Sequence, residues 1–164
     1  MARTAPQPTA SACSYVVGED GLARWSDEHA GAWIGLLQAH RQLVRELDAE
    51  LATEHGLGLS ELELLGRLAA AEHRRLRLST LAEQASLSLS RVSRIVDALE
   101  RRRLVERAAC PGDGRAVNAV LTDAGLALAR QAQESHYAGV QRRFFGRLDE
   151  HEVAALADIF GRFE

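Results

Sequence analysis

The feature that most constrains the fold is a pair of helical segments separated by a very short turn. Ser79 or Thr80 caps a first segment that ends near Ala85, and Ser88 is a favoured N-cap residue for the second. The apolar residues of the second segment recur at helical spacing and form one stripe, made of Val92, Ile95, Val96 and Leu99. Its opposite face carries mainly serine and arginine: Ser90, Arg91, Arg94, Asp97 and Arg101. This arrangement is typical of a helix-turn-helix.

A β-hairpin is predicted directly after the second helix. Leu104–Arg107 has the composition of a strand, Cys110–Arg115 is rich in turn residues, and Val117–Leu121 returns as a strand. Residues 75–78 alternate polar and apolar side chains, which indicates a further short strand. The helix at about residues 88–103 is therefore expected to be followed by a small wing at about 107–121.

Flanking helices are predicted from their capping signals. The first spans residues 26–54, and Ser60 with Glu63 forms a capping box for a second that ends near residue 72. Thr122 caps a long helix to about residue 145, and a box of Asp149 and Glu152 opens the last, to residue 163. The fold class is mainly α with a small β wing. Residues 1–25 are expected to be a flexible N-terminal arm and residues 26–164 a single domain.

Composition excludes several classes of protein. The chain has 164 residues, 46% of them hydrophobic, and no apolar run approaches the length of a membrane span, so no membrane partner is expected. No secretory signal precedes the first helix, and a cytoplasmic location is expected. Cys13 and Cys110 lie far apart without metal-ligand spacing, so neither a metal nor a cofactor is predicted. The sequence holds no nucleophile elbow or phosphate-cradling loop, and an enzyme is not predicted.

The charge of the chain is unevenly distributed. The formal net charge is −3, yet residues 74–115 contain ten arginines and five acidic residues, a local net charge of +5. Such a concentration of positive charge favours binding to phosphates, and double-stranded DNA is the expected partner.

Several stretches taken together resemble the MarR family of bacterial transcription regulators. They are Leu81–Glu83, Val92–Glu100, Leu104–Arg107, Asp113–Arg115 and Leu121–Gly125, in this order. The resemblance implies a winged helix-turn-helix with a helical dimerisation region. The DNA-binding lobe would span about residues 59–121, and the dimerisation helices about 26–54 and 122–163. It further implies a homodimeric, nucleoid-associated repressor on a palindromic operator.

The chain departs from the family at one position. Arg103 stands where the family usually has a glycine, just after the helix that would read the bases. A glycine tolerates the left-handed conformation that ends a helix, and an arginine there costs on the order of 1 kcal/mol. Either Arg103 accepts this strain or the helix ends differently. Arg103 also adds a charge beside Arg101 and Arg102 that could contact a phosphate.

The candidate DNA-binding residues lie at the start of the second helix of the helix-turn-helix and at the tip of the wing. On the helix they are Ser88, Ser90, Arg91, Ser93, Arg94 and, near its end, Arg101. Either Arg91 or Arg94 is expected to read a guanine edge, while Ser88 and Ser90 position the helix. The resemblance implies that Arg115 enters the minor groove. Asp113 is expected to orient an arginine, and Gly112 and Gly114 to permit the tight tip.

Members of the resembled family often respond to a small phenolic or anionic effector that binds between the dimer helices and the DNA-binding lobe. Trp33, His40, Arg41 and His73 could border such a cleft. The alternative is that Trp33 belongs to the dimer core and both histidines to the surface.

Two other functions stay open. One is a redox-sensing regulator of the same fold, for which Cys110, between Arg107 and Arg115 in sequence, is a better candidate than Cys13. The other is an all-helical protein-interaction module that does not bind DNA.

Overall fold

The computed structural model describes residues 15–110 and 113–163, with the backbone alone for residues 110 and 113–116. The chain divides into two compact units, one up to Gln42 and one from Leu43 onward. The division falls within the first helix, α1, which spans Asp27–His55. Each unit is described by itself.

The first unit consists of a β-hairpin and the first part of α1. Strands β1 (Tyr15–Val17) and β2 (Ala23–Trp25) pair antiparallel. Their turn is closed by a hydrogen bond from the Gly18 amide to the Leu22 carbonyl (2.9 Å), and Gly21 has a φ of 76°. The hairpin lies within residues 1–25, for which a flexible arm is the expectation from the sequence, although residues 15–25 have a strand–glycine–strand pattern. Residues 1–14, including Cys13, lie outside the described residues.

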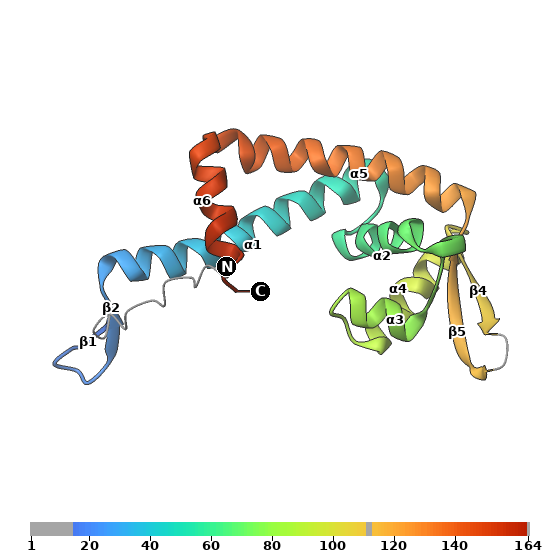
Figure 1. Cartoon of the computed structure of the whole chain (residues 1–164), viewed down its shortest axis with the longest axis horizontal. Helices are drawn as coiled ribbons and strands as arrows, with labels where there is room; N and C mark the ends of the chain where they lie inside the picture. The colour runs from blue at the N-terminus through green and yellow to red at the C-terminus, as the bar shows by residue number, and fades with distance from the viewer. Residues whose placement is uncertain (1–14, 111–112, 164) are drawn as a thin grey trace, which may run out of the picture. The chain divides into compact units, whose positions relative to one another are not determined.

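The second unit contains the rest of α1, five further helices and a three-stranded antiparallel sheet of order β3-β5-β4. Figure 1 shows the helices and the two longer strands of this unit, β4 and β5. Its helices after α1 are α2 (Leu59–Ala70), α3 (Leu78–Gln84), α4 (Leu89–Arg101), α5 (Asp123–Arg143) and α6 (Glu150–Phe160). Its strands are β3 (Arg75–Arg77), β4 (Val105–Cys110) and β5 (Asp113–Leu121). Short 3-10 turns occupy Glu72–Arg74 and Phe145–Arg147. The predicted fold class, mainly α with a small β wing, is confirmed.

Three of the predicted helix starts are confirmed and two are wrong. Ser88, Thr122 and Asp149 each accept a hydrogen bond from a backbone amide of the helix that they begin. In contrast, Gly58 rather than Ser60 is the N-cap of α2, and its amide donates to the Glu61 carboxylate at 2.8 Å. Helix α3 begins directly after β3.

The reason that α2 begins early lies outside the helix. The Leu59 amide donates to Asp48 Oδ1 on α1 at 2.7 Å, so a distant carboxylate satisfies a free helix amide. Glu63, the expected capping partner of Ser60, instead pairs with Arg67 at 2.7 Å. Likewise, Ser79 and Thr80 lie inside α3, because the chain turns from strand to helix at Arg77.

The core of the second unit is built from one face of each of α2, α3 and α4, with contributions from the sheet and α5. Its fully buried side chains are mostly leucine and valine: Leu51, Leu57, Leu64, Leu65, Leu68, Leu81, Leu99, Val92, Val96 and Val105. The stripe predicted on the second helix of the helix-turn-helix is therefore its buried face, and the serine and arginine face is left outside.

The first turn of α5 lies directly on the segment that joins α4 to β4. The Thr122 hydroxyl donates to the carbonyls of Arg103 (2.9 Å) and Leu104 (3.0 Å) and accepts from the Gly125 amide (2.9 Å). A Cβ on Gly125 would lie 2.0 Å from the Leu104 carbonyl oxygen. Only a glycine permits this approach.

Gly125→Ala is expected to lower the free energy of unfolding by about 2 kcal/mol, because the new methyl group collides with backbone that cannot rotate away. Gly66→Ala is the matched control: a Cβ there meets nothing within 4 Å, so alanine raises helix propensity by roughly 0.5–1 kcal/mol. Urea unfolding at a fixed protein concentration measures both. Equal stability of the two variants would contradict the close approach.

Candidate nucleic-acid interface

The N-terminus of α4 is held by its own serine. Ser88 Oγ accepts from the Arg91 amide at 3.3 Å and lies 3.2 Å from Ser90 Oγ. Both serines are exposed, as is Leu89 between them, with 53% of its surface accessible. Leu89 is not among the DNA-binding residues predicted from the sequence. The first turn of α4 therefore presents two hydroxyl groups and one apolar side chain to solvent.

Arg91 and Arg94 lie on the exposed side of α4 and line an open groove of about 570 Å³. Asp48, Ser60 and Glu61 contribute to the same groove. Arg91 Nη2 donates to Ser60 Oγ at 3.2 Å. Arg94 makes no hydrogen bond or ion pair with any side chain that the structure describes. Of the two arginines expected to read a base, Arg94 therefore has fewer polar contacts within the protein and is the more available for DNA.

Ser93 lies on a different side of α4, against the wing. Arg107 on β4 donates through Nη2 to the carbonyl and the hydroxyl of Ser93, both at 3.1 Å. The same nitrogen pairs with Asp97 at 2.6 Å. Glu100 Oε1 accepts from the Arg107 amide at 3.1 Å, and its other oxygen lies 3.4 Å from Nε. Arg107 therefore fastens the first wing strand to α4.

Sequence reasoning missed the role of Arg107. Ser93, Asp97 and Glu100 recur at spacings of four and three, which places them on one side of a helix. A row of one serine and two acidic residues, just before a strand that contains an arginine, could have indicated the contact between α4 and Arg107. Three polar partners on one guanidinium fix its orientation more firmly than a single exposed ion pair would.

The end of α4 resolves the question that Arg103 raised. Arg103 has a φ of 58°, its amide donates to the Glu100 carbonyl (2.8 Å), and the Leu104 amide donates to the Leu99 carbonyl (3.0 Å). These two bonds form a Schellman motif, so Arg103 accepts the left-handed conformation. Its neighbour Arg102 turns away from the exposed face of α4 and donates to the Gly56 carbonyl at 2.7 Å.

The wing forms as an antiparallel pair, β4 with β5, whose register shifts between Ala109 and Cys110. Gly112 and the side chains of Cys110, Asp113 and Arg115 lie outside the described residues, and the same holds for the surroundings of Gly114. The expectations for the wing tip, and for a redox-active Cys110, stay predictions. Arg101, near the end of α4, is exposed.

The four candidate effector residues are exposed. Trp33, His40 and Arg41 belong to the first unit, where Arg41 Nε donates to the Leu37 carbonyl at 3.0 Å. His73 belongs to the second unit, in the 3-10 turn after α2, and 84% of its side chain is accessible. None of the four lines the grooves found in the second unit.

An open groove of about 810 Å³ runs between α2 and α5 in the second unit. Its walls are apolar at Leu62, Ala129 and neighbouring residues, and its polar groups are Ser60, Glu63, Arg130, Gln133, His136 and Tyr137. Burial lowers the pKa of His136, against the opposing effect of Glu50, and so favours the neutral form of its imidazole. This groove could hold a small aromatic molecule with one or two polar groups.

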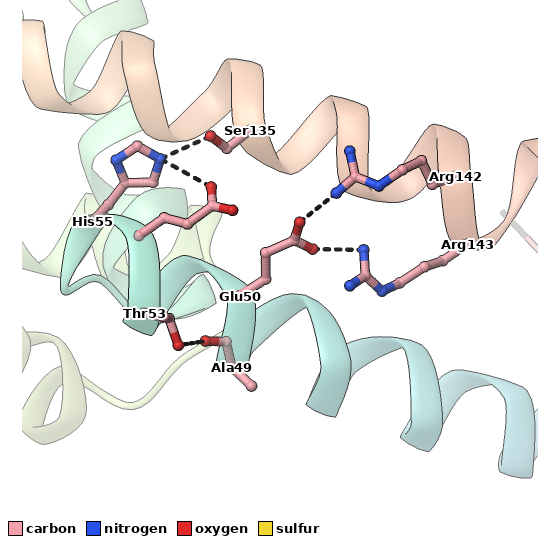
Figure 2. A network of polar contacts seen from close by, with 8 residues as sticks. Ala49, Glu50, Thr53, His55, Ser135, Arg142 and Arg143 are labelled. Atoms are coloured by element: carbon pink, nitrogen blue, oxygen red, sulfur yellow. Dashed lines mark hydrogen bonds and ion pairs between the residues drawn. The ribbon is translucent and has the colours of Figure 1, made fainter.

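A network of ion pairs holds α5 to the second half of α1 (Figure 2). The half-buried Glu50 pairs with Arg142 and with Arg143, whose Nη1 lies 2.6 Å from Glu50 Oε2. More than one helical turn after Glu50, His55 at the end of α1 forms a hydrogen bond with Ser135 on α5, and its Nε2 lies 2.8 Å from the Ser135 hydroxyl. These contacts fix the helix that forms one wall of the groove.

Over residues 15–110 and 113–163, no helix combines the length and apolar character that a bilayer span requires. Within the same ranges, no cluster of histidine, cysteine, aspartate or glutamate is arranged to hold a metal ion.

A helix-turn-helix formed by α3 and α4, followed by the β4–β5 hairpin on a sheet completed by β3, defines a winged helix fold. Residues 55–116 match a family model described as MarR family. A sequence comparison with curated proteins gives no match.

Solved structures extend the likeness to most of the chain. AbsC, a MarR family transcriptional regulator from Streptomyces coelicolor, has 32% sequence identity and a TM-score of 0.78, covering 85% of this chain and 95% of its own. Sco3205, a regulator of the same family and organism solved in complex with DNA, has 33% identity and a TM-score of 0.79, covering 85% and 88%. MarR from E. coli with operator DNA, at 23% identity and a TM-score of 0.69, shares the fold, covering 82% and 93%. The chain belongs to the MarR family of transcriptional regulators.

Arg103→Gly is expected to raise the free energy of unfolding by about 1 kcal/mol, because glycine adopts a positive φ without strain. The control is Arg101→Gly, which removes the same charge but places glycine inside α4 and is expected to cost about 1 kcal/mol. Thermal unfolding followed by circular dichroism gives the order of the three proteins. An Arg103→Gly variant that is no more stable than the original chain would contradict a strained helix end.

Proposed function

We propose that the chain represses transcription by binding duplex DNA as a homodimer. The observation that carries the proposal is the exposed face of α4. It presents Arg94 with no counter-ion among the described residues, next to Arg91, on a helix whose opposite face is fully buried. A helix of this kind fits the major groove, where arginine can bond both acceptors of a guanine edge. The DNA complex of the 33%-identical Sco3205 supports this use of the fold.

Each element of the lobe has a defined part in this mechanism. Ser88 and Ser90 lie at the N-terminus of α4, where hydroxyls and the helix dipole favour a phosphate. Leu89 can contact a thymine methyl group, and Arg101 a phosphate further along the groove. Arg115 at the wing tip would enter the adjacent minor groove, oriented by Asp113 on a tip that Gly112 and Gly114 keep tight.

Arg107 is proposed to coordinate the contact of α4 with the major groove and the contact of the wing with the minor groove. Because it joins β4 to Ser93, Asp97 and Glu100 on α4, the angle between helix and wing is set before DNA binds. The major and minor grooves of DNA can then be contacted without a further entropy cost for ordering the wing relative to α4. Ser93, expected at the sequence level to contact DNA, is proposed to act through this contact instead.

A homodimer doubles these contacts over the two halves of a palindromic site. Occupancy of such a site is sufficient to block a promoter, which favours repression. An all-helical module without DNA binding would account for the helices, but not for the exposed arginine face of α4.

The first test is the binding of duplexes, selected from a random library, by the full-length chain and its variants. Arg94→Ala is expected to weaken binding to the selected palindrome by roughly tenfold or more, the scale of one bidentate base contact, and to relax the base preference at one position. Arg147→Ala is the matched control, since this exposed arginine lies beyond the far end of α5 from α4. Fluorescence anisotropy at two salt concentrations measures affinity and salt slope.

The outcomes separate the alternatives. Salt-dependent, palindrome-selective binding that Arg94→Ala loses and Arg147→Ala keeps supports the proposal. If the unmodified chain does not bind duplex DNA at low salt, the chain is a protein-interaction module. If both variants bind as well as the original, Arg94 does not read a base, and the observation that carries the proposal fails.

Release by a small phenolic or anionic molecule is proposed to operate through the groove between α2 and α5. Ser60 lines both this groove and the one beside α4, and its hydroxyl accepts from Arg91 at 3.2 Å. A carboxylate or phenol bound near Ser60 and Arg130 would compete for that hydroxyl and change the position of Arg91.

The probes for this step are benzoate and phenol, added to the protein–duplex complex. Benzoate is expected to weaken DNA binding by the original chain several-fold, and Ser60→Ala is expected to reduce that effect while benzoate still binds. Calorimetry measures benzoate binding, and anisotropy measures the DNA affinity. Benzoate binding that leaves the DNA affinity of the original chain unchanged would reject this route of release.

A further inference from the structure

The N-terminal hairpin exposes nearly all of its large apolar side chains. They are Tyr15, Val16, Val17, Leu22 and Trp25, with accessible fractions between 45% and 66%. None of the described residues from 15 to 42 is buried. An isolated two-stranded hairpin is marginally stable at best in water. This hairpin therefore needs a surface to cover it.

One face of the hairpin carries only aromatic and aliphatic side chains. In its register Tyr15 pairs with Trp25 and Val17 with Ala23, and alternation along each strand puts these four side chains on the same side. The rings of Tyr15 and Trp25 meet edge to face at 6.1 Å. Val16 and Arg24 form the opposite face. A hollow of about 270 Å³ beside the two rings has space for a side chain from another molecule.

Helix α1 begins one residue after the hairpin, and further apolar side chains are exposed two turns into it. Trp33, Ile34, Leu36 and Leu37 are also exposed, on the helix proposed to form part of the homodimer. With aromatic side chains of about 150–250 Å² each, the exposed parts of this set amount to several hundred Å². That is the scale of the ~800 Å² that each partner buries in a standard interface.

We infer that the Tyr15–Trp25 face of the hairpin packs on a second copy of this chain, so that the dimer interface extends beyond the helices. The inference rests on the homodimer proposed above. A second copy is the occupant that the surface favours, because the apolar face is contiguous in sequence with the proposed dimer helix. A second copy of the chain is also present wherever the protein is, and none of the described residues from 15 to 42 is buried within the chain. Among the described residues of the DNA-binding lobe, 59–121, Leu89 is the only exposed large hydrophobic side chain.

The test compares Val17→Asp with Val16→Asp in the full-length chain. The two variants place the same charge on neighbouring positions of β1, but only Val17 lies on the Tyr15–Trp25 face. Sedimentation equilibrium is expected to show a dimer dissociation constant raised at least tenfold by Val17→Asp and changed less than threefold by Val16→Asp. Equal effects of the two substitutions, or none from either, would overturn the inference.

A spectroscopic measurement separates the occupants. Trp25 and Trp33 are the only tryptophans, so Trp33→Phe leaves Trp25 as the sole tryptophan, which can be excited selectively over tyrosine. Its acrylamide quenching is expected to be slow in the dimer and to increase several-fold on dilution to monomer. Fast quenching in the dimer overturns the inference while the homodimer stands. Slow quenching in the monomer also overturns it, because the chain then covers its own hairpin. A chain that binds DNA but never dimerises rejects the proposed homodimer itself.

Discussion

The second unit depends on the carbonyl group of Leu104. This oxygen, at the point where α4 gives way to β4, accepts from both the amide (3.1 Å) and the hydroxyl (3.0 Å) of Thr122. Gly125 lets the first turn of α5 reach it, and the left-handed Arg103 turns the chain so that it faces α5. One acceptor thus connects the helix proposed to read DNA, the wing and the long helix α5 of the proposed dimerisation region. A buried polar group with several partners fixes relative positions that apolar packing alone would leave adjustable.

The Arg107 contact has a different place in the same architecture. The Leu104 junction fixes where the wing begins, while Arg107, three residues along β4, fixes the direction in which it leaves α4. Its partners Asp97 and Glu100 carry two negative charges on the helix that is proposed to approach phosphates. Pairing them with Arg107 reduces the local repulsion of DNA, and Arg94 has no counter-ion among the residues that the structure describes.

The sequence predicted those features that depend on neighbouring residues. The caps at Ser88, Thr122 and Asp149 are formed within three residues of chain, and the buried stripe of α4 follows from helical spacing alone. The expected cap at Ser60 was wrong because Asp48, on another helix, satisfies the Leu59 amide. The Arg107 contact was missed for the same reason, since its partners meet it only after strand and helix pack. The composition of the N-terminal segment indicated a loose arm, and the hairpin there depends on cross-strand pairs such as Tyr15 with Trp25.

Ser60 shows how a single residue can acquire a part in function without a signal in the sequence. As a predicted N-cap it would have turned its hydroxyl to the backbone of α2. Because Asp48 and Glu61 satisfy the free amides at this helix start, the Ser60 hydroxyl is available to accept from Arg91. The same first turn of α2 lines the groove against α5. Of the residues that the structure describes, Ser60 alone therefore lies between a molecule bound in that groove and Arg91 on the exposed face of α4. Coupling between two sites requires a group whose arrangement both can bias, and in the proposed release mechanism the Ser60 hydroxyl would be that group.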